Sequence, residues 1–190
     1  MPKIGVLALQ GAFAEHMNIF TNLGYSTIQV RTINDLKNVD SIVIPGGEST
    51  VIGMQLKMSG MIKPLKQMIK EGMPTWGTCA GLILLSDDVD KQKQNSQEII
   101  GGLPIKTVRN YYGRQNESFQ AEILLENGNA QTAVFIRAPY IEHTDKQVQI
   151  LATYNGSAVA VQSGNLLGTC FHPELSDNNY WHKHFLKLLK

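Results

Sequence analysis

Residues 73–85 read Met73-Pro74-Thr75-Trp76-Gly77-Thr78-Cys79-Ala80-Gly81-Leu82-Ile83-Leu84-Leu85. Residues 73–78 have the composition of a short buried strand, and the apolar run 80–85 predicts a helix. The change from strand to helix therefore falls on Cys79, between two glycines. A strand that passes directly into a helix is typical of parallel α/β sheets.

The same alternation of strand and helix extends from this segment toward the N-terminus. The apolar pattern predicts strands over 3–9, 26–30 and 41–44, and helices over 12–23, 34–38, 49–59 and 62–70. After about residue 87 the strand-like segments are 105–109, 119–125, 133–137, 149–154 and 165–170, before a closing helix over 177–190 with Asp177 as its N-cap. We predict a single α/β domain over 1–190, with a flavodoxin-like, open, twisted, mostly parallel sheet flanked by helices and a β-rich second half.

Composition and charge exclude several classes of function. The chain has 190 residues, with 17 Lys and Arg against 16 Asp and Glu, and this net charge of +1 is too small to drive binding to nucleic acid. No apolar run approaches the roughly 20 residues of a membrane span, and the N-terminus lacks the pattern of a secretory signal. Two cysteines make no disulfide framework. We expect a cytoplasmic protein with neither nucleic acid nor membrane as a partner.

The glycines on either side of Cys79 give this turn the form of a nucleophile elbow, which holds a catalytic side chain above the carboxyl edge of a sheet. At a helix N-terminus, unpaired N–H groups and the helix dipole favour the thiolate. The N–H of Ala80 is placed to stabilise an oxyanion. Taken alone, the motif also fits a small buried residue at an ordinary turn.

The sequence Phe171-His172-Pro173-Glu174 offers a base for this thiol. In an extended chain, side chains two residues apart point to the same side, so Glu174 can reach the His172 ring and fix its tautomer. Cys79, His172 and Glu174 would then form a triad suited to acyl transfer. By itself, His172 also fits a structural histidine.

A third motif, Pro45-Gly46-Gly47-Glu48-Ser49, follows the expected strand 41–44 and so lies at the same sheet edge as Cys79. Adjacent glycines leave backbone N–H groups open to a ligand. We expect the Gly47 N–H to be a second oxyanion donor beside Ala80. A flexible turn capped by Ser49 is the alternative.

Together the three motifs resemble those of the class I (triad) glutamine amidotransferases. Further segments resemble one branch, the glutaminase subunits of pyridoxal 5′-phosphate synthase (the PdxT/SNO family): Leu9-Gln10-Gly11 with Glu15-His16, Arg109-Asn110-Tyr111-Tyr112-Gly113-Arg114-Gln115 and Phe135-Ile136-Arg137-Ala138-Pro139. The resemblance covers essentially the whole chain. It implies hydrolysis of L-glutamine to L-glutamate and ammonia through a cysteine thioester, without metal or other cofactor. It also implies a hetero-oligomeric complex in which ammonia is channelled to a synthase (lyase) subunit that makes pyridoxal 5′-phosphate.

The resemblance also implies roles for single residues. Gly47, Glu48 and Ser49 would line the glutamine pocket, and the amino-acid end of glutamine would bind a second group: Arg109, Ile136 and Arg137. A guanidinium suits this task because it can bind a carboxylate through two hydrogen bonds. Gln10 would lie near the oxyanion region, where arrival of the synthase subunit completes the hole. The chain departs from the family at Tyr111 and Gln120, which concerns only the pocket rim or the partner surface.

The remaining candidate residues are interpreted as structural rather than functional. We expect Cys170 to be a small core or pocket-wall residue. Three methionines at helical spacing predict core packing, with a surface for the synthase subunit or an ammonia exit as the alternative: Met54, Met58 and Met61. We expect three histidines at the surface or in loops: His143, His182 and His184. Glu15 and His16 are too close in sequence to form a site alone, and no set of residues has metal-ligand spacing.

Two other interpretations stay open. A cysteine hydrolase or peptidase of the DJ-1/PfpI group also has its cysteine at such an elbow. That group takes its histidine from just after the cysteine, where this chain has Ala80. The second interpretation is a non-catalytic redox or ligand-binding module. The presence of all three triad residues argues against it.

Overall fold

The computed structural model describes residues 1–90, 97–112 and 118–189. Its first half alternates strands and helices: β1 (Lys3–Leu7), α1 (Phe13–Asn22), β2 (Ser26–Val30), α2 (Ile33–Leu36), β3 (Ser41–Ile44), α3 (Ser49–Met58), α4 (Ile62–Lys70), β4 (Thr75–Thr78) and α5 (Ala80–Leu85). Each of these elements was predicted, and α4 and α5 have the predicted bounds.

The second half consists mainly of strands: β5 (Ser86–Val89), β6 (Leu103–Tyr112), β7 (Ser118–Leu125), β8 (Ala130–Ile136), β9 (Ala138–Thr144), β10 (Gln149–Tyr154), β11 (Ser157–Ser163) and β12 (Leu166–Thr169). A 3-10 helix, η1 (Pro173–Leu175), and the helix α6 (Tyr180–Leu186) complete the chain. This confirms the β-rich second half.

The large sheet has the strand order β2-β1-β3-β4-β12-β11-β10-β7-β8. The strands from β2 to β12 in this order are parallel, and those from β12 to β8 are antiparallel. The strands β3, β4 and β12 are therefore parallel neighbours, and their carboxyl ends meet at one edge. All three predicted motifs follow directly from these strand ends. The predicted open α/β fold is confirmed, and the antiparallel strands extend its parallel half.

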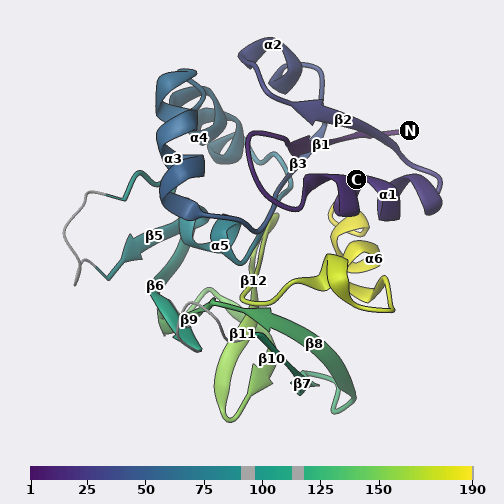
Figure 1. The fold of residues 1–190 in the computed structure, drawn as a ribbon, viewed down its shortest axis with the longest axis vertical. Coiled ribbons are helices and arrows are strands. Elements are labelled where there is room, and N and C mark those ends of the chain that lie inside the picture. Colours follow the sequence, from purple (N-terminus) through teal and green to yellow (C-terminus); the bar gives the residue numbers. More distant parts are fainter. Residues whose placement is uncertain (91–96, 113–117, 190) are drawn as a thin grey trace.

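Helices cover both faces of the parallel strands. Figure 1 shows α3 and α4 on one side of these strands and α1 and α6 on the other. The short helix α5 contacts β4 and α3. The core between these layers is apolar, and its largest buried side chains include Trp76, Phe20, Phe135, Phe171 and Phe185. Burial of such aromatic side chains stabilises the layered arrangement.

The structure corrects several expectations. A second sheet of order β5-β6-β9 was not predicted, and neither were β5, β9 and β11. The closing helix is shorter than 177–190, and its N-cap is Asn179 rather than Asp177. Of the methionine stripe, Met61 is buried as expected, whereas Met54 and Met58 are 51% and 79% exposed.

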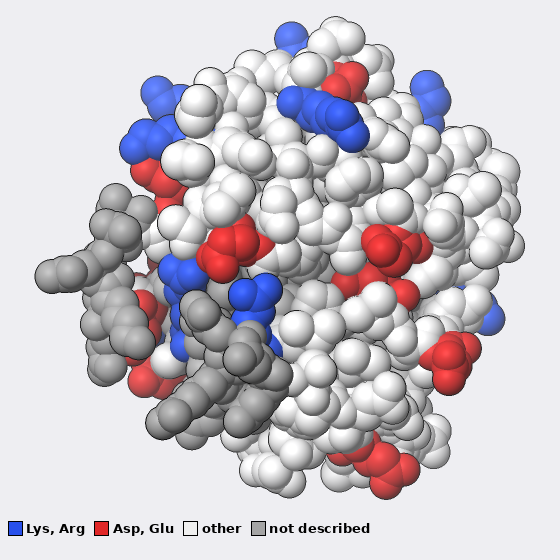
Figure 2. All heavy atoms as spheres, in the orientation of Figure 1, with Lys and Arg blue, Asp and Glu red and all other residues white. Residues whose placement is uncertain are grey.

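The surface carries no dominant charge on the face drawn in Figure 2, where acidic and basic side chains are scattered among uncharged ones. This agrees with the small net charge of the chain. Within the described residues, no helix is both long and apolar enough to cross a membrane.

Candidate active site

Cys79 lies at the turn between β4 and α5 with a φ of +48°, a conformation that non-glycine residues rarely adopt. The flanking glycines make this turn possible. A Cβ atom on Gly77 would lie 2.5 Å from the backbone of Gly81, and a Cβ atom on Gly81 would lie 1.9 Å from the carbonyl oxygen of Ile44. The turn thus has the crowded, strained geometry of a nucleophile elbow.

The His172 ring reaches the same sheet edge from the segment that follows β12. Its Nδ1 lies 2.7 Å from Oε1 of Glu174, and the Glu174 side chain is fully buried. The backbone N–H of His172 donates to the carbonyl of Val134 in β8 at 2.8 Å. The ring also packs against Gly46, where a Cβ atom would lie 2.4 Å from its Cε1. The predicted pairing of His172 with Glu174 is therefore present.

In its thiol form Cys79 donates from Sγ to the carbonyl oxygen of Ile136, at 3.7 Å. Among the described residues, no hydrogen bond of good geometry joins this sulfur to the His172 ring. The two groups are nevertheless close enough to interact, since Cys79 contributes to the pKa of His172. Activation of the nucleophile therefore requires the thiol proton to turn from the carbonyl toward the ring.

The electrostatics of the pair favour proton transfer. Burial acts to lower the pKa of His172, but the proximity of Cys79 and the hydrogen bond and charge attraction with Glu174 outweigh it and raise the pKa from 6.5 to about 10. Burial acts to raise the pKa of Glu174, but attraction and hydrogen bonding from His16 and His172 bring it well below its usual value. Glu174 is therefore ionised at neutral pH, and His172 retains a proton beside the sulfur.

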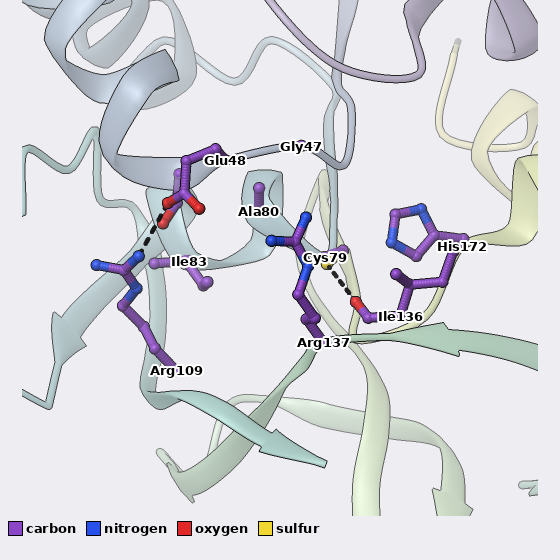
Figure 3. Close-up of a pocket in the computed structure, with 10 residues that line it drawn as sticks. Gly47, Glu48, Cys79, Ala80, Ile83, Arg109, Ile136, Arg137 and His172 are labelled. Atoms are coloured by element: carbon purple, nitrogen blue, oxygen red, sulfur yellow. Dashed lines mark hydrogen bonds and ion pairs between the residues drawn. The ribbon is translucent and has the colours of Figure 1, made fainter. Parts of the chain in front are cut away.

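A pocket opens above Cys79 (Figure 3). It is lined by Gly47, Glu48, Ser49, Cys79, Ala80, Ile83, Arg109, Ile136, Arg137 and His172. All of these except Ile83 were predicted from the sequence. The structure thus brings together residues of β6 and β8, of the segments that follow β3, β4, β8 and β12, and of the helices α3 and α5. Glu174 lies behind His172, outside the pocket lining.

Charged groups stand at one side of this pocket. The guanidinium of Arg109 contacts Oε1 of Glu48 at 3.0 Å, as drawn in Figure 3. Arg137, between β8 and β9, has a φ of +46°. The Ser49 hydroxyl donates to Oε1 of Gln97 at 3.0 Å, and the Gln97 amide donates to the carbonyl of Ser49. Opposite charges next to a nucleophile suit a zwitterionic substrate.

Gly47 and Ala80, which carry the two expected oxyanion donors, both line this pocket. Ala80 is the first residue of α5, where backbone N–H groups have no partner within the helix. A Cβ atom on Gly47 would meet the Gln10 side chain. Gln10 does not line the pocket: its Oε1 accepts a hydrogen bond from the Glu48 N–H at 2.8 Å. Gln10 therefore contacts the loop that carries Gly47 rather than the pocket itself.

Sequence reasoning missed two histidines beside the triad. His16 in α1 and His182 in α6 are both fully buried, although His182 was expected at the surface. Nε2 of His16 lies 3.3 Å from Oε2 of Glu174, and its Nδ1 lies 2.9 Å from Nε2 of His182. The Glu15–His16 pair in the motif was the available signal, but its partners are far away in the sequence.

The other candidates fall into three groups. Cys170 is a buried free thiol of the core, as predicted, and burial raises its pKa. Residues 113–117 and the side chains of Tyr111 and His143 lie outside the described part of the structure. Within the described part, no group of three or more His, Cys, Asp or Glu side chains is arranged to hold a metal ion.

Comparison with known proteins identifies close relatives. The model of the SNO glutamine amidotransferase family matches residues 6–190. The chain is 44% identical to pyridoxal 5′-phosphate synthase subunit PdxT of Clostridium acetobutylicum, over 98% of this chain and 100% of that protein. It is also 44% identical to the subunit of the same name from Saccharolobus solfataricus, over 99% of each chain.

Solved structures agree with these relatives. A crystal structure of a glutamine amidotransferase has 36% sequence identity and a TM-score of 0.91, over 98% of each chain. The structure of PurLQS from Thermotoga maritima has a TM-score of 0.73 at 15% identity, over 100% of this chain and 99% of that one, which shows a shared fold alone. In the present chain the histidine next to the sulfur comes from after β12, unlike the arrangement of the DJ-1/PfpI group.

Proposed function

Because the chain belongs to the SNO glutamine amidotransferase family, we propose that it hydrolyses L-glutamine and supplies ammonia to a pyridoxal 5′-phosphate synthase. The observation that carries this proposal is the single pocket in which Cys79, His172 and two arginines meet. A thiol beside a histidine–carboxylate pair performs acyl transfer, and the charged wall suits the amino-acid end of glutamine.

In the first half of the reaction Cys79 attacks the side-chain amide of glutamine. The new S–C bond gives a tetrahedral intermediate whose oxyanion accepts hydrogen bonds from the N–H groups of Gly47 and Ala80. Each such donor is worth about 3 kcal/mol of transition-state stabilisation. The C–N bond then breaks, and protonated His172 gives its proton to the departing ammonia, which leaves a glutamyl thioester on the sulfur.

In the second half His172 acts as the base. Neutral after the first half, its ring takes a proton from a water molecule whose oxygen attacks the thioester carbon. The C–O bond forms, the S–C bond breaks, and glutamate is released, while the ring keeps the proton and faces the sulfur again. Glu174 keeps Nδ1 of the ring protonated in both halves, because it accepts from that nitrogen at 2.7 Å.

Substrate orientation follows from the charges in the pocket. The guanidinium groups of Arg109 and Arg137 would bind the α-carboxylate, and the Glu48 carboxylate would attract the α-ammonium group. Gly47, Ser49 and Ile136 complete the lining on either side of the sulfur. The amide is thereby directed toward Cys79 between the two oxyanion donors.

The partner in this proposal is the synthase subunit of a hetero-oligomeric complex. Its support is that the curated relatives are named subunits of pyridoxal 5′-phosphate synthase and match this chain over nearly their whole length. Gln10 touches the loop of Gly47, which offers a route by which docking would adjust the oxyanion hole. We therefore expect low activity without the partner. The two free thiols suit the reducing cytoplasm.

The test is to measure glutamate released from glutamine, with and without a synthase subunit. Wild-type protein should turn over glutamine, and more rapidly with the partner. Cys79→Ala should reduce kcat to background. Cys170→Ser, which changes the other cysteine, should keep the wild-type kcat. Both variants should be compared at equal folded concentration.

Three outcomes would contradict parts of the proposal. Turnover that persists unchanged in Cys79→Ala would remove the thioester mechanism. Cleavage of peptides but not of glutamine would favour the peptidase interpretation. Glutamine hydrolysis without binding to a synthase subunit, measured by analytical ultracentrifugation, would leave the glutaminase activity and remove the assignment to vitamin B6 synthesis.

A further inference from the structure

A buried histidine pair lies behind the catalytic carboxylate, on the side away from the pocket. His16 comes from α1 and His182 from α6, and neither ring has any solvent-exposed surface. Histidine rarely sits fully buried without a polar partner. The hydrolysis described above uses neither ring, so their position next to Glu174 needs its own explanation.

Glu174 has two carboxylate oxygens, and the reaction uses one of them. Oε1 accepts from His172, whereas Oε2 is buried and faces Nε2 of His16 at 3.3 Å. This contact is longer than a good hydrogen bond, and Oε2 has no better partner among the described residues. Without His16, an ionised oxygen would face an apolar interior, which is costly.

The hydrogen positions that make this contact attractive are fixed by the next ring. A His16 ring with a single proton that donates from Nε2 to Glu174 has an Nδ1 that can only accept. Nε2 of His182 lies 2.9 Å from that nitrogen and can donate to it. Burial lowers the pKa of His182 from 6.5 to about 3, so this ring is neutral and has one proton to place.

The remaining surroundings support the same assignment. Nδ1 of His182 has no hydrogen-bond partner among the described residues, which suits a nitrogen without a proton. The Thr78 hydroxyl lies 3.5 Å from Nε2 of His16 and can accept a share of its proton. Trp76 and Phe20 enclose His182 edge-on, and Trp76 encloses His16 in the same way. The donors thus run in one direction, from His182 through His16 to Glu174.

We propose that His16, held in its Nε2–H tautomer by His182, is a positioning residue that keeps Glu174 ionised and aimed at His172. This inference rests on the glutaminase reaction proposed above. It deepens that reaction, because it extends the triad by two residues that contact neither substrate nor the sulfur. The titratable groups around Glu174 are then His172 on its own segment, His16 on α1, His182 on α6 and, beyond His172, Cys79 at the start of α5.

Two substitutions of His16 separate positioning from packing. His16→Leu fills the space but cannot donate, whereas His16→Gln carries an amide N–H near the position of Nε2. In the complex with the synthase subunit, we expect His16→Leu to lower kcat about 10- to 100-fold with little change in KM, by analogy with the loss seen when residues that orient metal ligands are replaced. His16→Gln should recover most of this loss. His184→Gln, a change of the other α6 histidine, should match wild type.

The pH dependence gives a readout that packing alone would not move. Loss of His16 removes a group that favours ionised Glu174, so the acid limb of kcat/KM should shift to higher pH in His16→Leu and stay near wild type in His16→Gln. Equal loss in both variants with an unshifted pH profile would overturn the proposal in favour of a structural role. Wild-type kcat and pH profile in His16→Leu would overturn it as well.

A second measurement does not depend on glutamine turnover. Histidine 15N–1H NMR spectra of the wild-type full chain should show a proton on Nε2 of both His16 and His182, and the pKa of His172 should fall in His16→Leu. A proton on Nδ1 of His16, or an unchanged His172 titration, would overturn the proposal. If wild type fails to hydrolyse glutamine, the proposed function fails while these spectra still decide the role of His16.

Discussion

Cys79 has a positive φ, and the turn that holds it is possible because Gly77 and Gly81 on either side have no side chains. A Cβ atom on Gly81 would lie 1.9 Å from the carbonyl oxygen of Ile44, a distance that real Cβ atoms do not reach. Because the obstacle is backbone of a central strand, no side-chain rotation can relieve it. The motif is thus a steric requirement as much as a chemical one.

This steric requirement leads to a prediction for Gly81→Ala. We expect the free energy of unfolding to fall by about 3 kcal/mol, because the strand and helix must separate to admit one carbon atom. Gly128→Ala is the control: it has a φ of +82° but open space around it, so it should cost only about 1 kcal/mol. Unfolding in guanidinium chloride measures the free energy of unfolding of both variants. An equal loss in Gly81→Ala and Gly128→Ala would show that the turn at Cys79 can relax.

A second prediction at this scale concerns substrate binding. Arg137→Gln removes a guanidinium from the pocket wall, and a hydrogen bond to a charged group is worth about 1.5–3 kcal/mol. We expect KM for glutamine to rise about 10- to 100-fold, with a smaller change in kcat. Arg31→Gln is the control: Arg31 is exposed and lies over the Phe13 ring, so its loss should leave KM unchanged. A fall in kcat at constant KM would assign Arg137 to the transition state instead.

Among the elements, the start of α3 depends on a contact that is distant in sequence. The Gln97 amide donates to the carbonyls of Ser49 and Glu98, and its oxygen accepts from the Ser49 hydroxyl. Ser49 also lines the pocket. The segment at Gln97 therefore holds the substrate-facing end of α3 in place.

Gln97→Ala should weaken both stability and binding. Loss of these hydrogen bonds should cost about 1–2 kcal/mol of unfolding free energy and raise KM for glutamine severalfold, with kcat nearly unchanged. Thermal unfolding and steady-state kinetics check the two effects. Gln67→Ala, which removes an exposed hydrogen bond from Gln67 on α4 to Glu71 at the end of that helix, should change neither stability nor KM. An unchanged KM would show that Ser49 keeps its place without Gln97.

The elements differ in how far the sequence predicts them. The helices α4 and α5 were predicted with their observed bounds, because apolar periodicity and the glycine positions mark their ends. β5 (Ser86–Val89) was missed because two aspartates interrupt it; pairing with β6 and the bond from the Gly102 N–H to Asp87 hold it. β11 alternates alanine and valine, a weak signal that becomes a strand through burial between β10 and β12.

At the scale of the whole molecule, the buried histidines should set the pH of maximum stability. His182 has a folded pKa lowered to about 3, so the unfolded chain binds the extra proton below 6.5 and stability falls as pH decreases from 6.5 to 3. His172 has a folded pKa raised to about 10, so its contribution is complete below 6.5 and is lost as pH rises toward 10. Stability should therefore be greatest near neutral pH.

Urea unfolding across this range checks the prediction. On the acid side, one proton gives a slope of about 1.4 kcal/mol per pH unit, which should shrink in His182→Phe. On the alkaline side, the slope should shrink in His172→Gln. Glu174, with its lowered pKa, adds a further loss below about 4.5, so Glu174→Gln should flatten the most acidic part and, because Glu174 also raises the pKa of His172, reduce the alkaline slope. An acid limb unchanged in His182→Phe would contradict the assignment of His182 as neutral.

The pocket residues could be predicted from the sequence because they lie in local motifs. The pair His16 and His182 could not, because it forms only through contacts between distant segments. Local motifs at strand ends carry the pocket residues, and parallel strands bring their carboxyl ends to one edge. His16 and His182 are 166 residues apart and meet only because α1 and α6 pack on the same side of the sheet. Their contact depends on the assembled layers, which no local pattern encodes.

The large sheet is continuous from β2 to β8, and this has a consequence for dividing the polypeptide. The proposed nucleophile, Cys79, belongs to residues 1–90, whereas His172, Glu174 and the two pocket arginines belong to residues 97–189. Two fragments expressed separately would each hold an incomplete set of reactive groups, and β4 would lack its neighbour β12. Mixing the fragments would restore turnover only if these strands re-pair, which makes the chain suited to a split-protein complementation assay.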